Sequence, residues 1–258
     1  MKLEIKKGAF FNTLNTTNKN KKSLFYIVVA DVIFLAALFL LGQVFSAISF
    51  SVAATQTYKL LSLAALYYMA LLFIYSFFKY IVLSFIKSSF AKSKLEFSRL
   101  WKFYLLNILV FLILFLAFFL LSLLAASIKQ GIAPYISLLI LLLFSVFAYA
   151  FANMSQILFY EGRSVGNSLQ LGAKALTKIK HYYGVYLVII AAFAIVYLLF
   201  SIFGNLLKIT LFQDYASLLK YGDVYTIIFV HAVGIILYIA ILFNRYYFYS
   251  IVKEKLLK

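Results

Sequence analysis

Six polar side chains interrupt the long apolar stretches of this sequence, and their chemistry is that of ion pairing or anion binding. One is a carboxylate, two are cations and three are amides: Asp31, Lys79, Asn107, Gln156, Asn244 and Arg245. Ionisable residues within apolar spans are rare, and they usually pair with one another or mark a functional site. These six residues therefore form the candidate site, and their spacing predicts one shared polar layer in the cytoplasmic third of the membrane.

Asp31 and Lys79 are the first two residues that this spacing brings to the same depth. At about 1.5 Å per residue, antiparallel helices place both side chains roughly 10 Å into the membrane. A lone charge near the membrane centre costs about 2.5–3.5 kcal/mol on insertion scales. The sequence therefore predicts an Asp31–Lys79 ion pair.

Two interpretations of the polar layer remain open. In the first, the layer is structural: Asp31 pairs with a cation, and Lys79 and Arg245 extend toward the membrane surface along their apolar stems. In the second, the carboxylate of Asp31 neutralises only one of the two cations, Lys79 and Arg245, so that one positive charge remains. The phosphate or carboxylate of a lipid or small anion then fills that place.

The sequence contains few of the side chains that catalysis or metal binding requires. There is no cysteine, and neither a P-loop nor an HExxH motif occurs. His181 and His231 are far apart, and seven acidic residues in the whole chain leave little for acid–base or metal-assisted catalysis. We therefore predict no enzyme activity, no cofactor and no metal site.

The apolar stretches that carry these residues are long enough to cross a membrane six times. They cover residues 24–49, 60–86, 103–128, 134–160, 182–204 and 224–251, and about 20 residues suffice for one crossing. Of the 24 Lys and Arg residues, only Lys59, Lys129, Lys208 and Lys220 lie on one side. By the positive-inside rule, both termini are cytoplasmic and the protein is a multi-pass protein of the cell membrane. The rule also explains the net charge of +17 without a nucleic-acid partner.

An internal repeat relates the odd-numbered apolar stretches by a shift of about 79 residues. The repeat divides the single membrane domain, residues 1–258, into approximate units 1–87, 88–163 and 164–258. In each unit a basic segment precedes a pair of spans, and segments 88–102 and 164–181 place apolar residues at helical spacing. We therefore predict an all-α integral membrane fold of three amphipathic-helix-plus-hairpin units.

The amphipathic helices are predicted to lie in the headgroup layer, with their basic side toward anionic lipid. The candidate lipid contacts are Lys94, Arg99, Trp101, Lys102, Lys174 and Lys178. The alternatives are that these helices only orient the hairpins that follow, or that they bind a cytoplasmic protein.

One connection between spans resembles a known type of membrane domain. The residues are FYEGRSV at 159–165, then Ser168, Leu169 and ALTK at 175–178. They are similar to the same connection in poorly characterised six-helix families, among them the membrane domain attached to some glycerophosphodiester phosphodiesterases. The resemblance implies a six-helix architecture and assigns no catalytic residue.

These observations predict a non-catalytic polytopic membrane protein, a scaffold or partner subunit whose amphipathic helices rest on anionic lipid. A protein partner or a homo-oligomer is consistent with such a role. The alternative is a carrier or binder of a lipid or small anion through the polar layer. The excess of Lys, Asn, Ile, Phe and Tyr is typical of an AT-rich prokaryotic genome.

Overall fold

The computed structural model describes residues 9–50, 56–91, 95–126, 133–177, 183–210 and 215–255. Within these ranges the protein is helical and contains no strand. Six of its helices are long and apolar enough to cross a membrane, which confirms the number of spans predicted from the sequence.

The spanning helices follow one another in three consecutive pairs. The first hairpin consists of α2 (Lys21–Phe50) and α3 (Thr57–Phe90), and the second of α4 (Leu100–Ala126) and α5 (Ala133–Tyr160). The third hairpin consists of α7 (Tyr183–Thr210) and α8 (Tyr215–Lys255). Two short helices, α1 (Ala9–Lys19) and α6 (Val165–Leu176), precede the first and third hairpins.

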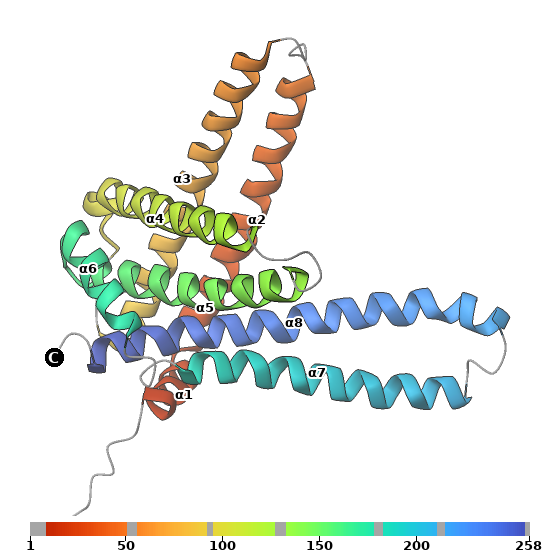
Figure 1. Ribbon diagram of the computed structural model, residues 1–258. Helices are drawn as coiled ribbons and strands as arrows, with labels where there is room; N and C mark the ends of the chain where they lie inside the picture. Colours follow the sequence, from red (N-terminus) through yellow and green to blue (C-terminus); the bar gives the residue numbers. More distant parts are fainter. Residues whose placement is uncertain are drawn as a thin grey trace, which may run out of the picture.

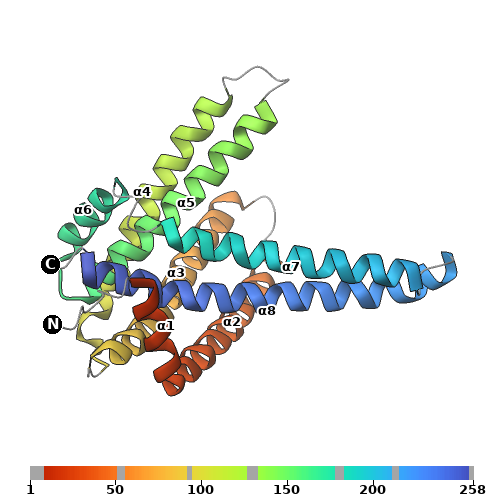
Figure 2. The ribbon, with the colours of Figure 1, turned by 90° about the horizontal axis from the view of Figure 1, so that it is seen from below.

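The three hairpins converge at one end and diverge toward the other, as Figures 1 and 2 show from two directions. We call the convergent end the junction and the diverging remainder of each hairpin its arm. The junction contains the buried core, in which Ile86, Phe103, Phe159, Tyr246 and Phe248 are almost completely enclosed. The three hairpins therefore hold together at one end of the molecule.

The arms expose apolar side chains around most of their circumference. Leu61, Tyr135 and Tyr197 are 73%, 77% and 71% exposed. A helix that is apolar on all sides is stable in hydrocarbon, where its backbone hydrogen bonds are satisfied internally. The arms are accordingly suited to a lipid environment along their length.

The connection between α3 and α4 differs from the prediction of an amphipathic helix over residues 88–102. Helix α3 continues to Phe90, and in the described part of the connection, which resumes at residue 95, a 3-10 turn, η1 (Phe97–Arg99), precedes α4. Glu96 has an extended backbone, and its carbonyl oxygen accepts a hydrogen bond from the Tyr80 hydroxyl at 2.6 Å. This contact holds the residue before η1 against α3.

The connection between α5 and α6 is a tight turn whose residue types explain its geometry. Gly162 has a φ of 105°, and its N–H donates to Phe159 while the N–H of Arg163 donates to Leu158. This is the usual hydrogen-bonding pattern of a glycine-terminated helix. The side chain of Ser164 then accepts from the N–H of Asn167 and caps α6.

Helix α6 lies against the second hairpin through small side chains. Its buried residues are Ser168, Gly172 and Ala175. A side chain at Gly172 would collide with Ser155 of α5, so glycine permits the close approach of the two helices. Helix α6 therefore rests on protein along one side and exposes the opposite side.

Candidate functional site: a polar layer between the hairpins

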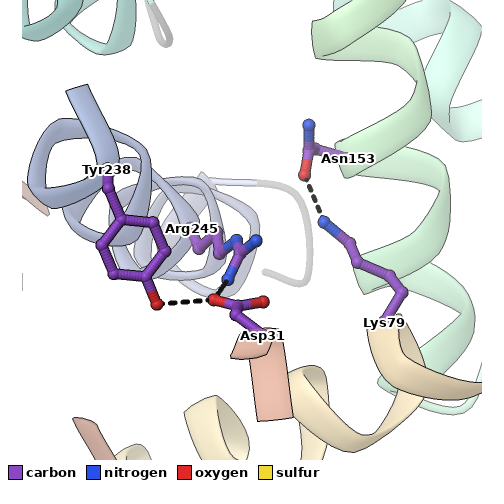
Figure 3. A network of polar contacts seen from close by, with 5 residues as sticks. All are labelled: Asp31, Lys79, Asn153, Tyr238 and Arg245. Atoms are coloured by element: carbon purple, nitrogen blue, oxygen red, sulfur yellow. Dashed lines mark hydrogen bonds and ion pairs between the residues drawn. The ribbon is translucent and has the colours of Figure 1, made fainter. Parts of the chain in front are cut away.

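A partly buried ion pair joins the first and third hairpins. Nη1 of Arg245 in α8 lies 2.5 Å from Oδ2 of Asp31 in α2, and the Tyr238 hydroxyl donates to the same oxygen at 2.8 Å (Figure 3). Tyr238 and Arg245 are seven residues apart, about two helical turns, so they share one face of α8. Two groups of the third hairpin therefore bind the carboxylate of the first.

Lys79 of α3 joins the first and second hairpins instead. Its ammonium group donates to Oδ1 of Asn153 in α5 at 2.8 Å, and Figure 3 shows the Lys79 side chain extending toward Asn153. The Asn153 amide in turn donates to the Tyr149 carbonyl oxygen at 2.8 Å. The predicted Asp31–Lys79 ion pair is therefore wrong. Asp31 faces α8, where Arg245 reaches it, whereas Lys79 faces α5.

A set of neutral hydrogen bonds extends the contact between the first two hairpins. The Asn107 amide of α4 donates to the Ser76 hydroxyl of α3 at 2.9 Å. Gln156 of α5 donates to Oδ1 of Asn107 at 2.7 Å and to the Tyr75 hydroxyl at 3.0 Å. Asn107 and Gln156 are both buried, so the structure brings these two predicted residues into direct contact.

The structure also buries the last predicted residue of the layer, Asn244, which is completely enclosed next to Arg245 in α8. Asp31 is 8% exposed. All six residues that the sequence singled out thus lie on the spanning helices, and five of them take part in the contacts described above.

A small cavity of about 40 Å³ separates the two cationic groups. Its lining is Asp31, Phe34, Tyr75, Phe78, Lys79, Val82 and Arg245. Within the described part of the chain, Asp31 forms its ion pair with Arg245, and Lys79 forms none. The lining therefore carries one positive charge more than it neutralises, and the cavity has room for only a few water-sized groups.

A second ionic contact lies at the junction and joins all three hairpins. Nζ of Lys87 in α3 lies 3.5 Å from Oε1 of Glu161, which follows α5, and the Tyr249 hydroxyl of α8 donates to the same oxygen. Lys87 also lies over the ring of Tyr160, 5.5 Å from its centroid. Sequence reasoning missed this cluster because Glu161 is in a connection rather than within an apolar stretch.

Four further partners of the layer were also missed, namely Tyr75, Ser76, Asn153 and Tyr238. Tyrosine is frequent in this chain, with 21 residues, so its presence in a span carries little information. Asn153 lies three residues before Gln156, on the same face of α5. That spacing was the available signal for its participation.

The candidate lipid contacts have different environments. The Arg99 guanidinium stacks 4.4 Å from the centroid of Phe159 and donates to the Arg163 carbonyl oxygen at 2.8 Å, so it binds protein. Trp101 is 70% exposed, and Lys102 and Lys174 are exposed as well. Lys94 and Lys178 lie outside the described residues.

No group of three or more histidine, cysteine or acidic side chains that could hold a metal ion occurs among the described residues.

No protein-family model, curated protein or solved structure matches this chain. The resemblance of segment 159–178 to six-helix membrane families accordingly stays a prediction.

Proposed function

We propose that this protein is a non-catalytic membrane scaffold or partner subunit, which acts through contacts with lipid and with another protein or a second copy of itself. One observation carries the proposal: the polar side chains within the spans bind one another across the hairpins. Arg245 binds Asp31, Lys79 binds Asn153 and Asn107 binds Ser76. The layer thus joins three hairpins, and the cavity that it lines is small, about 40 Å³.

The proposal includes a cell-membrane location with both termini cytoplasmic and three repeated units. The contact of Asn12 with Glu254 at 2.6 Å supports the location of both ends on one side of the membrane, because it brings the beginning of α1 beside the end of α8. The basic residues Lys87, Arg99, Arg163 and Lys253 lie at the same end of the hairpins. Anionic lipid in the cytoplasmic leaflet attracts such residues.

The test compares wild type with Asp31→Asn and Arg245→Met after purification in a mild detergent. Native mass spectrometry identifies bound small molecules, and thermal unfolding measures stability. A scaffold is expected to lose stability in both variants and to carry no bound molecule that depends on Arg245. A specific adduct that disappears in Arg245→Met, while that variant stays folded, would contradict the scaffold proposal.

The second candidate function is the binding or transport of a small anion through the polar layer. The observation in its favour is the positive charge that remains around the cavity after Asp31 pairs with Arg245. A cavity of about 40 Å³ admits a water-sized ion and is too small for a lipid headgroup. In this case chloride or bromide raises the unfolding temperature relative to gluconate in wild type, and Lys79→Met abolishes the difference.

A further inference from the structure

A polar pocket of about 500 Å³ lies at the junction, between α1 and the last turns of α8. Figures 1 and 2 both show these two helices in contact. Its lining includes Asn15, Thr16 and Lys19 of α1, Phe90 of α3, and Lys253 and Glu254 of α8. Lys19 follows Thr16 by three positions and Asn15 by four, so these residues share one face of α1, and this face lines the pocket.

The charges of this pocket favour an anion. Glu254 accepts hydrogen bonds from Asn12 at 2.6 Å and from Ser250 at 3.2 Å, so its carboxylate is held by the walls. Lys19 and Lys253 are exposed, and among the described residues neither takes part in an ion pair. Two ammonium groups and one engaged carboxylate leave a net positive charge.

The opposite side of α1 places the pocket at the level of lipid headgroups. Phe10, Phe11 and Leu14 are exposed there, Phe11 by 59%. The ring of Phe10 packs against Phe243 and Tyr247 of α8, which is a spanning helix. A short helix with exposed aromatic and aliphatic residues on one side and polar residues on the other lies at the headgroup–acyl boundary. A lipid can therefore reach the pocket from the bilayer.

We propose that this pocket binds the headgroup of an anionic phospholipid, with its phosphate between Lys19 and Lys253. Ammonium groups form strong charge-assisted hydrogen bonds with phosphate oxygens. Asn15 and Thr16 supply neutral hydrogen-bonding groups for the hydroxyls of a headgroup such as glycerol. The inference rests on the proposed function in one respect, the placement of α1 at the cytoplasmic headgroup layer.

The pocket also discriminates against a zwitterionic headgroup. A choline group binds best over an aromatic face or beside a carboxylate. Here the ammonium of Lys253 already lies over the Phe90 ring, 5.5 Å from its centroid. The carboxylate of Glu254 is likewise engaged by Asn12 and Ser250. Both features that would hold choline are therefore occupied.

The experiment measures the binding of short-chain phosphatidylglycerol to the full-length protein in detergent by native mass spectrometry, with short-chain phosphatidylcholine and inorganic phosphate as separate arms. The test variant is Lys19→Gln/Lys253→Gln. The matched control is Lys21→Gln/Lys22→Gln, which removes the same charge from the first turn of α2, outside the pocket. Thermal unfolding without added lipid verifies that both variants fold, and Lys19→Arg/Lys253→Arg verifies that charge at the pocket suffices.

The expected result is phosphatidylglycerol binding that the test variant weakens about tenfold or more, while the control and the arginine variant retain it. Equal weakening in the test and control variants would show diffuse attraction to basic residues and overturn the inference. Equal binding of phosphatidylcholine, or binding of inorganic phosphate without preference for lipid, would overturn it as well. The scaffold proposal is tested separately through Asp31 and Arg245, so the two failures are distinguishable.

Discussion

The first hairpin contacts its two neighbours by different means. Toward the third hairpin it presents a charge, Asp31, which Arg245 neutralises and Tyr238 binds. Toward the second it presents a cation, Lys79, whose hydrogen-bond partner among the described residues is the neutral amide of Asn153, together with a set of neutral hydrogen bonds. The comparison teaches that, within the polar layer, one interface contains an ion pair, whereas the described contacts of the other are hydrogen bonds. The ion pair of Lys87 with Glu161 lies outside the layer, at the junction.

The largest expected effect comes from breaking the charged interface. Arg245→Met leaves the carboxylate of Asp31 buried without a counter-ion, and removing one partner of a buried pair destabilises a protein by about 3–5 kcal/mol. We expect a marked fall in the thermal unfolding temperature of the detergent-purified protein. An unchanged temperature would show that Tyr238 or solvent compensates Asp31.

A double variant sharpens this result. In Asp31→Leu/Arg245→Met neither charge remains, and replacing a buried ion pair by apolar groups is often neutral or stabilising. The double variant is therefore expected to recover most of the stability that Arg245→Met loses. If the double variant instead loses as much stability as Asp31→Leu and Arg245→Met lose together, the two residues do not act as a pair. The charged interface then does not depend on charge compensation.

The second effect breaks the neutral interface. Asn107→Leu removes the hydrogen bonds to Ser76 and Gln156, while Gln156 still donates to Tyr75 and Ser76 still donates to the Leu72 carbonyl oxygen. Each lost hydrogen bond costs about 0.5–1.5 kcal/mol net, so the loss of stability should be smaller than in Arg245→Met. The unfolding temperatures of the two variants, measured side by side, decide whether this order holds.

Tyr238→Phe tests the auxiliary contact of the charged interface. The substitution removes one hydrogen bond to Asp31 while the ion pair with Arg245 stays in place. A typical hydrogen bond contributes about 0.5–1.5 kcal/mol net, and we expect a loss in this range. A loss as large as that of Arg245→Met would mean that the phenol, rather than the guanidinium, is the principal partner of Asp31.

The smallest effect is expected at Lys79, although it too is a cation within a span. Lys79→Met removes a charge that no carboxylate compensates within the described residues, and its aliphatic stem is replaced by one of similar size. The change in unfolding free energy should lie within about 0.5 kcal/mol of zero, or be stabilising. A loss as large as that of Arg245→Met would show that Lys79 has a strong anionic partner.

The sequence indicated that these residues lie close together, but it did not identify all of their partners. Helical rise and the antiparallel order of the spans relate Asp31, Lys79, Asn107 and Gln156 to one layer, and the structure places Asn107 and Gln156 in contact. The same spacing does not say which neighbouring helix each side chain faces. Two cations at equal depth were therefore equally suitable partners for Asp31, and the prediction chose the one on the adjacent span.

The connections between spans were harder to predict than the spans. Periodicity suggested a helix in both 88–102 and 164–181, but within the described parts of these segments only the second contains a separate α-helix, α6. The second segment follows a glycine with a positive φ, and Ser164 caps the new helix. The first follows directly on α3 and is bound to it through Tyr80. Local capping, rather than apolar spacing, distinguishes the two.

The distance along the chain between Asp31 and Arg245 has a consequence for biosynthesis. The two residues are separated by 214 positions, so Asp31 enters the membrane long before its counter-ion has been synthesised. At about 5–20 residues per second the delay is roughly 10–40 seconds. During this time the first hairpin holds an uncompensated carboxylate in lipid, and the emergence of the last span completes the assembly. A chain interrupted before α8 would therefore expose a recognisable defect to membrane quality control.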